Sequence, residues 1–277
     1  MLHHACLVII RGENRDNATD GNKLCARAEA EFKMRKKRQK RVKRLKRPGR
    51  WLLAGLGACL LFSLAPVIVL RWVTPPTSAV MLQRILMEGH EIDYQWVPLA
   101  QITPQAALAV IAAEDQKFPD HWGFDLQAIR DAVEHKARGH RLRGASTLTQ
   151  QVARNLFLWQ GRSYLRKGLE AWFTLLLELS WPKQRILEVY LNIAETGPQT
   201  FGIQAAARRY FGRAARTLSP EQAALIAAIL PNPLRFHADR PSEYVLSRRD
   251  HILQQMSQLG GPAYLQNILP GTSTTPR

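Results

Sequence analysis

Apolar residues recur with the period of an α-helix along the chain from about residue 100 onwards. The segment Thr103–Glu114 begins with an N-cap threonine and a first-turn proline, and its apolar face continues to Glu114 at the i, i+3, i+4, i+7 spacing. Similar apolar stripes occur at residues 169–177 and 186–194. A capping box at Ser219–Gln222 opens a further helix rich in alanine. These patterns predict a series of helices.

No run of alternating residues typical of a β-strand accompanies these helices. The pattern therefore predicts one mostly α domain over residues 96–262, followed by a loose tail at 263–277. Residues 1–33 lack sustained periodicity and are expected to be disordered. Because Met34 directly precedes a basic run, we hypothesise that it is the true start and that residues 1–33 are a mis-annotated extension. Native peptides from residues 13–30 would contradict this hypothesis.

Another apolar segment, Trp51–Leu70, has 20 residues and no charged side chain. A helix of this length spans about 30 Å, the thickness of the hydrocarbon core of a bilayer. The apolar run is longer than that of a cleaved signal peptide, so it predicts an uncleaved transmembrane helix. Residues 71–95 then form a linker to the helical domain.

The formal net charge of the chain is +17, from 39 Lys and Arg and 22 Asp and Glu. Twelve of the basic residues lie in Lys33–Arg50, directly before the apolar segment, and no acid accompanies them. The positive-inside rule places this segment, 34–50, in the cytoplasm and the domain at 96–262 on the other side of the membrane. Attraction to anionic lipids explains such a basic segment, so no nucleic-acid partner is expected.

The three cysteines, Cys6, Cys25 and Cys59, all lie in or before the apolar segment. The domain at 96–262 has none. It therefore needs no disulfide, and a cysteine nucleophile or a thiolate metal site is excluded there.

Four stretches could carry chemistry. In the first, AAEDQKFPDHWG, Glu114 continues a buried face, and burial of a carboxyl raises its pKa towards the range of a general acid or base. The alternative is an exposed helix end with a solvated acid pair. In the second, GASTLTQQVAR, hydroxyls and amides at a predicted helix N-terminus precede Arg154, which suggests an anion site or an ordinary capped helix.

The third stretch places Arg166, Lys167 and Glu170 on one side of a helix, either as a surface salt bridge or as a basic wall beside the anion site. In the fourth, KQRILEVYLNIAETG, a polar stripe of Glu188, Asn192 and Glu195 opposes the apolar one. We interpret that stripe as structural, because its hydrogen bonds can orient helices around the site.

Taken together, the four stretches resemble the glycosyltransferase family 51 domain, the peptidoglycan polymerase. The family pattern reads ED-x-x-F-x-x-H-x-G, G-x-S-T-x-T-Q-Q, R-K-x-x-E and K-x-x-I-L-E-x-Y-L-N. It occurs here, in this order, at Glu114–Gly123, Gly144–Gln151, Arg166–Glu170 and Lys183–Asn192. The resemblance is closest to the monofunctional members, so we expect no transpeptidase domain and no S-x-x-K nucleophile. One departure is Arg154, because the family usually has lysine there.

The resemblance implies a lysozyme-like helical glycosyltransferase domain with a small membrane-proximal lobe. It implies polymerisation of lipid II with inversion at C1 of the donor MurNAc and release of undecaprenyl pyrophosphate. Glu114 is then the general base, and Glu170 is the second catalytic carboxylate. The residues implied to bind substrate are Ser146, Thr147, Gln150, Gln151, Arg154, Arg162, Arg166 and Lys167. Those implied to support the site are Asp115, Phe118, His121, Gly123 and Asn192.

No obligatory cofactor is implied, although the resemblance leaves room for a divalent cation, Mg²⁺ or Mn²⁺, at Glu170. The implied partners are lipid II, the growing glycan chain and the bacterial inner membrane, with binding to other cell-wall synthases or division proteins left open. Two other classes remain to be separated from a polymerase. A lytic cell-wall enzyme shares the fold but needs no basic wall, and a membrane-anchored scaffold would use only Lys33–Arg50.

Overall fold

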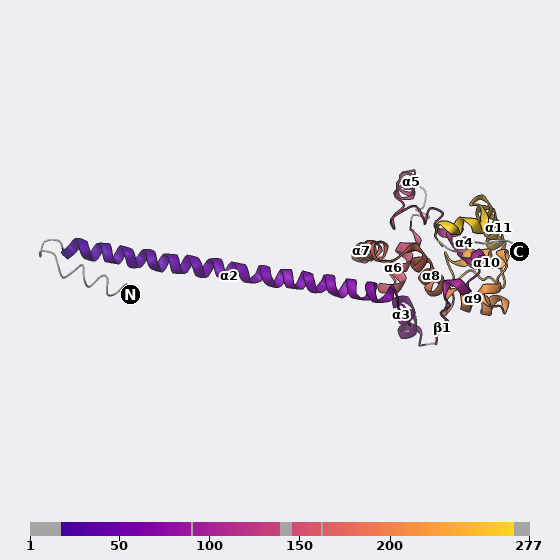
Figure 1. Ribbon diagram of the computed structural model, residues 1–277, viewed down its shortest axis with the longest axis horizontal. Coiled ribbons are helices and arrows are strands. Elements are labelled where there is room, and N and C mark those ends of the chain that lie inside the picture. Colours follow the sequence, from indigo (N-terminus) through magenta and orange to yellow (C-terminus); the bar gives the residue numbers. More distant parts are fainter. Residues whose placement is uncertain (1–17, 90, 139–145, 162, 269–277) are drawn as a thin grey trace. The chain divides into compact units, whose positions relative to one another are not determined.

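The computed structural model describes residues 18–89, 91–138, 146–161 and 163–268 (Figure 1). The chain divides into two compact units, Met1–Phe62 and Ser63–Arg277. The first contains most of the long helix α2, Ala18–Leu70. Among the described residues, one stretch, Leu53–Leu70, is long and apolar enough to cross a membrane, with a mean hydropathy of 2.4.

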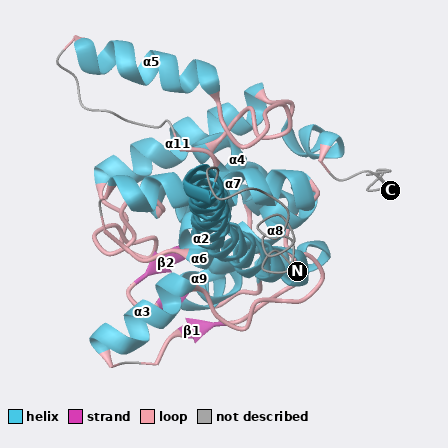
Figure 2. Cartoon of the chain, turned by 90° about the vertical axis from the view of Figure 1, so that its left-hand side faces the viewer, coloured by secondary structure: helices cyan, strands magenta, loops and turns pink. Residues whose placement is uncertain are grey.

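The second unit is mostly helical, as the sequence predicts. Its α-helices are α3 Ala79–Glu88, α4 Pro104–Glu114, α5 Leu126–Ala137, α6 Leu148–Phe157, α7 Tyr164–Ser180, α8 Lys183–Ile193, α9 Gly202–Phe211, α10 Pro220–Ile229 and α11 Glu243–Gln258. Three short 3₁₀ helices are η1 Leu99–Gln101, η2 Ala215–Thr217 and η3 Gly261–Asn267. In Figure 2, α5 lies apart from the other helices of this unit.

Helix α4 forms the centre of the core. Residues 106–112 of this helix are all buried, and they are small or aliphatic. A helix that is apolar on every side is stable only when neighbours surround it, and α4 packs against α10 and α11. Thr103 occupies the N-cap position without a side-chain capping bond, and Pro104 fills the first turn. Glu114 is the last residue of α4 and its only carboxylate, and it comes directly after the buried apolar stretch of the helix.

The capping boxes predict helix starts well. At α10, Ser219 and Gln222 make both reciprocal capping bonds, and Thr147 and Gln150 do the same at α6. The apolar stripes at 169–177 and 186–194 are confirmed as the inner faces of α7 and α8. Helix α6 packs against both of these helices, so the second and third sequence stretches meet.

A small sheet of three strands was not expected from the sequence. Its strands are β1 Asp93–Tyr94, β2 Glu195–Gly197 and β3 Thr200–Phe201, in the order β1-β3-β2. β1 is parallel to β3, and β2 is antiparallel to it. Strands of two or three residues are too short to show alternation, which explains why the pattern missed them.

Three segments differ from the expected organisation. Residues 71–95, expected as a linker, contain α3 and β1, and Met81 is fully buried. In the expected tail, η3 packs on the core through Leu265, and Ile268 is buried as well. Residues 18–33, expected to be disordered, are helical and belong to α2.

The end of α2 is fastened to the second unit. The indole N–H of Trp181 donates to the carbonyl of Val67 at 2.7 Å. The guanidinium of Arg185 donates to the carbonyls of Leu70 and Val73 at 3.0 and 2.8 Å. Backbone carbonyls at a helix C-terminus lack intrahelical donors, so these side chains cap α2 where it joins the helical unit.

Candidate active site

Glu114 ends α4 with one oxygen bound and one less constrained. Its Oε2 accepts a hydrogen bond from Nε2 of Gln151 on α6 at 2.9 Å. Its Oε1 lies 3.7 Å from the guanidinium of Arg248 on α11. The side chain is only 15% exposed. Burial raises the pKa of Glu114 above its ordinary value, although the Gln151 hydrogen bond and the charges of Arg248 and Arg154 act in the opposite direction.

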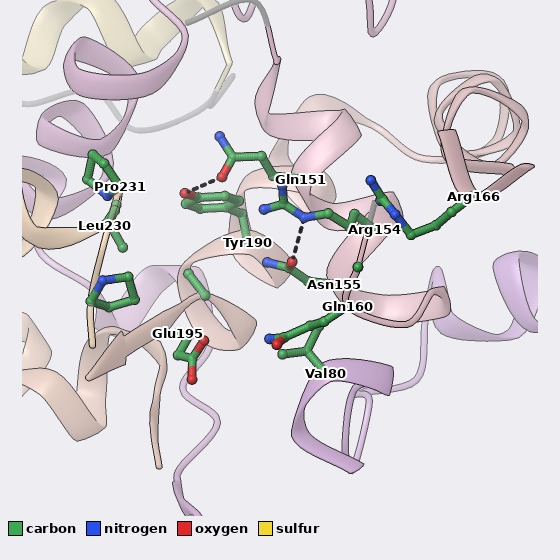
Figure 3. Close-up of a pocket in the computed structure, with 13 residues that line it drawn as sticks. Val80, Gln151, Arg154, Asn155, Gln160, Arg166, Tyr190, Glu195, Leu230 and Pro231 are labelled. Carbon is green, nitrogen blue, oxygen red and sulfur yellow. Dashed lines mark hydrogen bonds between the residues drawn. The ribbon is translucent and has the colours of Figure 1, made fainter. Parts of the chain in front are cut away.

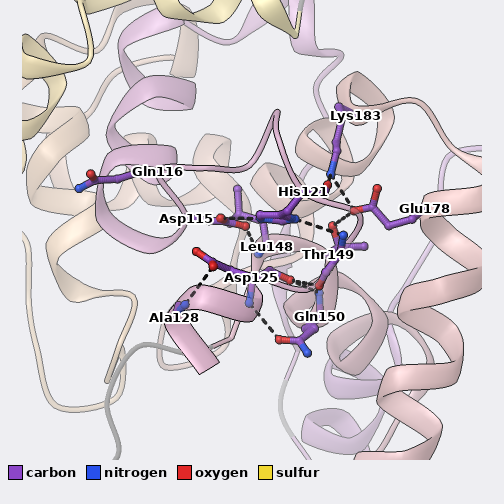
Figure 4. Close-up of polar contacts among 12 residues, drawn as sticks. Asp115, Gln116, His121, Asp125, Ala128, Leu148, Thr149, Gln150, Glu178 and Lys183 are labelled. Carbon is purple, nitrogen blue, oxygen red and sulfur yellow. Dashed lines mark hydrogen bonds and ion pairs between the residues drawn. The ribbon is translucent and has the colours of Figure 1, made fainter. Parts of the chain in front are cut away.

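Both carboxylate oxygens of the neighbouring Asp115 have hydrogen-bond partners. Its Oδ1 bonds Nε2 of His121 at 2.8 Å, and its Oδ2 accepts from the backbone N–H of Leu148 at 2.9 Å (Figure 4). Leu148 is the first residue of α6, so Asp115 places a carboxylate at that helix N-terminus. The two adjacent acids therefore face different surroundings.

The turn after Asp115 is held from several sides. The N–H of Gly123 donates to Nδ1 of His121 at 3.1 Å, so Nδ1 is the acceptor and Nε2 is the ring nitrogen that bonds Asp115. Phe118 is fully buried, and Lys183 lies 4.7 Å above its ring. Gly123 has φ of 76°, and a Cβ there would lie 2.6 Å from Thr174 on α7. No other residue fits both requirements.

The N-terminus of α6 differs from the expected anion site. Thr147 caps the helix, accepts the N–H of Gln150 and donates its hydroxyl proton to the carbonyl of Gly123 at 2.7 Å. The Oε1 of Gln150 accepts the N–H of Thr147, so this buried side chain completes the capping box. Asp115 therefore supplies a carboxylate of the protein itself at this helix N-terminus.

A cavity of about 350 Å³ opens beside this network (Figure 3). Gln151, Arg154, Arg166 and Tyr190 are among its lining residues. Burial raises the pKa of the Tyr190 hydroxyl well above its ordinary value, so it stays protonated. It donates to Oε1 of Gln151 at 3.2 Å, which turns the Gln151 amide N–H towards Glu114. The hydrogen bonds thus run from Tyr190 through Gln151 to Glu114.

The charged lining of the cavity consists of Arg154, Arg166 and the carboxylate of Glu195, which pairs with Arg84. Arg154 donates to Oδ1 of Asn155 at 3.2 Å and forms no ion pair with any residue that the structure describes. Arg166 pairs with Glu170, but its buried Nε–H makes no hydrogen bond within the described ranges. Both guanidinium groups point into the same space in Figure 3. A site of this kind is suited to phosphate oxygens, which accept several charge-assisted hydrogen bonds.

Glu170 orients two cations of α7. Its Oε2 accepts from Nη1 of Arg166 at 2.9 Å, and its Oε1 pairs with the ammonium of Lys167. The glutamate is buried, whereas the side chain of Lys167 is 52% exposed. Each oxygen of Glu170 thus faces a cation, and this pairing holds both basic side chains in place. The described residues include no group of three His, Cys, Asp or Glu side chains that could hold a metal ion.

A smaller cavity of about 160 Å³ is lined in part by the acid pair. Its lining includes Glu114, Asp115, Lys117 and Ser146. Since Glu114 lines this cavity and Gln151 lines the larger one, their hydrogen bond lies between the two. A carboxylate in that position can act on a group in the smaller cavity while the cations act on a group in the larger one.

The predicted polar stripe on the fourth stretch is wrong in part. Helix α8 ends at Ile193, and Glu195 lies on β2, where it pairs with Arg84 of α3 at 2.9 Å. Asn192 is fully buried and does not oppose the apolar face. It binds both the N–H and the carbonyl of Val97, at 2.8 and 2.9 Å. Asn192 therefore fastens the chain before α4 to α8.

The structure brings most of the predicted site residues together. Glu114, Gln151, Arg154 and Arg166 surround adjoining cavities, and Glu170 supports Arg166. Ser146 lines only the smaller cavity, and Thr147 and Gln150 are used in capping. Arg162 lies outside the described residues.

Some residues near the site were not predicted. Tyr190 belongs to the apolar stripe of α8, and its hydroxyl gave no separate signal. Arg248 and Arg84 come from α11 and α3. Their contacts join distant parts of the sequence, so no local pattern indicates them.

The expectation of no S-x-x-K nucleophile needs a correction, because the letters occur at Ser180–Lys183. They span the end of α7 and the start of α8. The ammonium of Lys183 donates to Oε1 of Glu178 at 2.8 Å and to the carbonyl of His121 at 2.6 Å. The Lys183 side chain therefore joins the turn at His121 to the end of α7, which is a structural role.

Comparison with known proteins gives a consistent result. Residues 80–257 match the transglycosylase family. The chain is 56% identical over 223 residues to the biosynthetic peptidoglycan transglycosylase of Pseudomonas entomophila (strain L48), which covers 79% of this chain and 92% of that protein. It is 56% identical over 225 residues to the protein of the same name from Stutzerimonas stutzeri (strain A1501), at 79% and 90% coverage. With that from Xanthomonas campestris pv. campestris (strain B100), identity is 54% over 226 residues, at 78% and 91% coverage.

Proposed function

Because the chain belongs to the transglycosylase family and is a peptidoglycan glycosyltransferase of cell-wall synthesis, we propose that it polymerises lipid II into glycan strands. The observation that carries this proposal is the adjacency of a buried carboxylate and a cavity lined by Arg154 and Arg166. Glu114 is suited to take a proton from a sugar hydroxyl. Arg154 and Arg166 are suited to a leaving group that gains negative charge.

In the proposed reaction, the 4-hydroxyl of the acceptor GlcNAc attacks C1 of the donor MurNAc. The new C1–O bond forms as the bond from C1 to the pyrophosphate oxygen breaks, and attack from the opposite face inverts C1. Glu114 takes the hydroxyl proton on Oε1, and the electron pair of the broken bond leaves on undecaprenyl pyrophosphate. Glu114 then returns the proton to solvent before the next cycle.

The cations contribute by stabilising the charge that grows on the leaving pyrophosphate. Their hydrogen bonds are directed before reaction begins, because Glu170 fixes Arg166 and Lys167. Preorganised donors of this kind act most strongly where water is excluded. We therefore assign Glu170 a positioning role through the two cations.

The apolar segment Leu53–Leu70 supports the proposal that the enzyme is anchored in the bacterial inner membrane. The basic residues that precede it favour a cytoplasmic N-terminus and a periplasmic catalytic domain. An anchor keeps the site beside a substrate that itself lies in the membrane, and this raises the effective concentration of both.

The test is polymerisation of purified lipid II by the detergent-solubilised full chain. We expect glycan strands that a muramidase digests to disaccharide units, and inhibition by a moenomycin-type compound that resembles the growing chain. No strand formation over a range of detergents would reject the proposal. Release of muropeptides from lipid-free sacculi would instead support a lytic enzyme.

A further inference from the structure

Arg248 lies outside the four sequence stretches and still reaches the acid at the centre of the site. It is on α11, and its Nη2 is 3.7 Å from Oε1 of Glu114. Within the described part of the chain, Glu114 is its ion-pair partner, and its buried Nε–H makes no hydrogen bond. Its charge is therefore not shared with another carboxylate.

Three charged groups act on Glu114, namely Asp115, Arg154 and Arg248, and Lys117 and Asp125 line the same smaller cavity. Asp115, next to it in sequence, disfavours the ionised form, and so does burial. Arg154 of α6 and Arg248 of α11 favour that form. The Tyr190 hydroxyl of α8 remains neutral, and it acts only through Gln151. Two cations thus offset the cost of a buried carboxylate.

These two cations are not equivalent during the reaction. Arg154 lines the larger cavity, where an anionic leaving group would engage it, whereas Arg248 does not line that cavity. Once an anion binds, the charge of Arg154 is compensated and its effect on Glu114 falls. Arg248 is then the cation that still acts on the acid.

We propose that Arg248 is a positioning residue for the base, which keeps Glu114 ionised and orients Oε1 while Arg154 is engaged by the leaving group. This inference rests on the proposed function, because it gives Glu114 the role of base. The adjacent Arg249 provides a matched control, since it pairs with Asp250 at 2.6 Å and makes no ion pair with Glu114.

The experiment measures the protonation of Glu114 directly and also through activity. The full chain and the variants Arg248→Gln, Arg248→Lys and Arg249→Gln are labelled with a water-soluble carbodiimide, which reacts with protonated carboxyls, across a pH series. Tandem mass spectrometry then gives the labelling midpoint at Glu114. The same proteins are assayed for kcat/KM of lipid II polymerisation against pH.

Loss of the cation disfavours the carboxylate, so the midpoint in Arg248→Gln is expected to rise by about one pH unit. The acidic limb of kcat/KM should rise with it. Arg248→Lys should recover at least half of the shift, and Arg249→Gln should show none. If Arg248→Gln does not fold, Arg248→Met retains the apolar stem and carries the same expectation.

An unchanged midpoint in a folded Arg248→Gln protein would overturn the inference. An equal rise in Arg249→Gln would also overturn it, because the effect would then be a general loss of positive charge. If the wild type makes no strands but the labelling midpoint still rises in Arg248→Gln, the proposed function is rejected. The coupling of Arg248 to Glu114 is then established by itself.

Discussion

The two sides of the acid pair at the end of α4 differ in how completely their hydrogen bonds are used. On one side, both oxygens of Asp115 are hydrogen-bonded, one to His121 and one to the first residue of α6. On the other, Glu114 has one bound oxygen and faces a cavity. The same functional group is thus a structural anchor in one position and, in the proposed reaction, the general base in the next. What separates them is the number of lone pairs left over after folding.

The cations show a similar contrast. Lys183 makes two hydrogen bonds and lies over the ring of Phe118, so it is held on all sides. Arg154 has only Asn155 as a hydrogen-bond partner within the described ranges. A charge that the fold already satisfies stabilises the protein, whereas a charge held in place and unsatisfied can bind substrate.

The largest expected effect is on the reactive side. Glu114→Gln removes the proton acceptor but keeps the shape and the hydrogen bond from Gln151. We expect lipid II polymerisation to fall by about 10²–10⁴-fold, the usual contribution of a general base. The measurement is kcat/KM with detergent-solubilised protein. Exposed Glu221 on α10 provides the control, because Glu221→Gln should keep full activity. A rate for Glu114→Gln near that of the wild type would remove Glu114 from the mechanism.

The next effect belongs to the structural side. Asp115→Asn can accept from His121 or from the N–H of Leu148, but not donate to either, so one buried donor loses its partner. We expect the free energy of unfolding to fall by about 2 kcal/mol. Urea denaturation followed by tryptophan fluorescence measures it. Equal stability of this variant and the wild type would mean that the acid pair does not divide as described.

The raised pKa of Glu114 fixes the sign of a smaller effect on stability. A carboxyl whose pKa is higher in the folded chain than in the unfolded chain loses folding free energy as pH rises through the interval between the two values. Glu114→Gln should therefore be more stable than the wild type near neutral pH. The difference should vanish below about pH 4, where both states are protonated. Urea denaturation at both pH values checks this, and a less stable mutant near neutral pH would contradict it.

The smallest effect concerns the departure from the family pattern at Arg154. Lysine keeps the charge and loses the fork of the guanidinium, including its bond to Asn155. We expect Arg154→Lys to change kcat/KM by less than about tenfold, which corresponds to 1.4 kcal/mol. Arg154→Gln should lose at least ten times more than Arg154→Lys. Equal losses in the two variants would show that geometry, and not charge, is what the site needs from Arg154.

The sequence predicts what depends on neighbours along the chain. Capping at Ser219 and the apolar faces of α7 and α8 are local patterns, and they are found where expected. The motif residues are predicted for the same reason, since each stretch is short. Arg248 could not be predicted, because its meeting with Glu114 depends on how α11 packs on α4. Glu195 was assigned to a helix because nothing in the letters shows that α8 ends at Ile193.

The anion site illustrates a different limit. The hydroxyls and amides at Ser146–Gln151 are typical of a helix N-terminus that binds an anion, and the structure has such a terminus. Its anion is Asp115, which belongs to the protein itself. The residue types indicate that this helix N-terminus can bind an anion. Only the packing of α4 beside α6 decides that Asp115 is the anion bound there.

The bond from the Tyr264 hydroxyl to the carbonyl of Gln116 spans 148 positions of the chain. Gln116 lies in the turn directly after the acid pair, and Tyr264 lies in η3, near the C-terminal end of the described residues. A ribosome releases a chain from its N-terminus, at roughly 5–20 residues per second. The turn that carries the acids is therefore completed many seconds after it is synthesised. The site therefore cannot reach the arrangement described here before η3 has been synthesised.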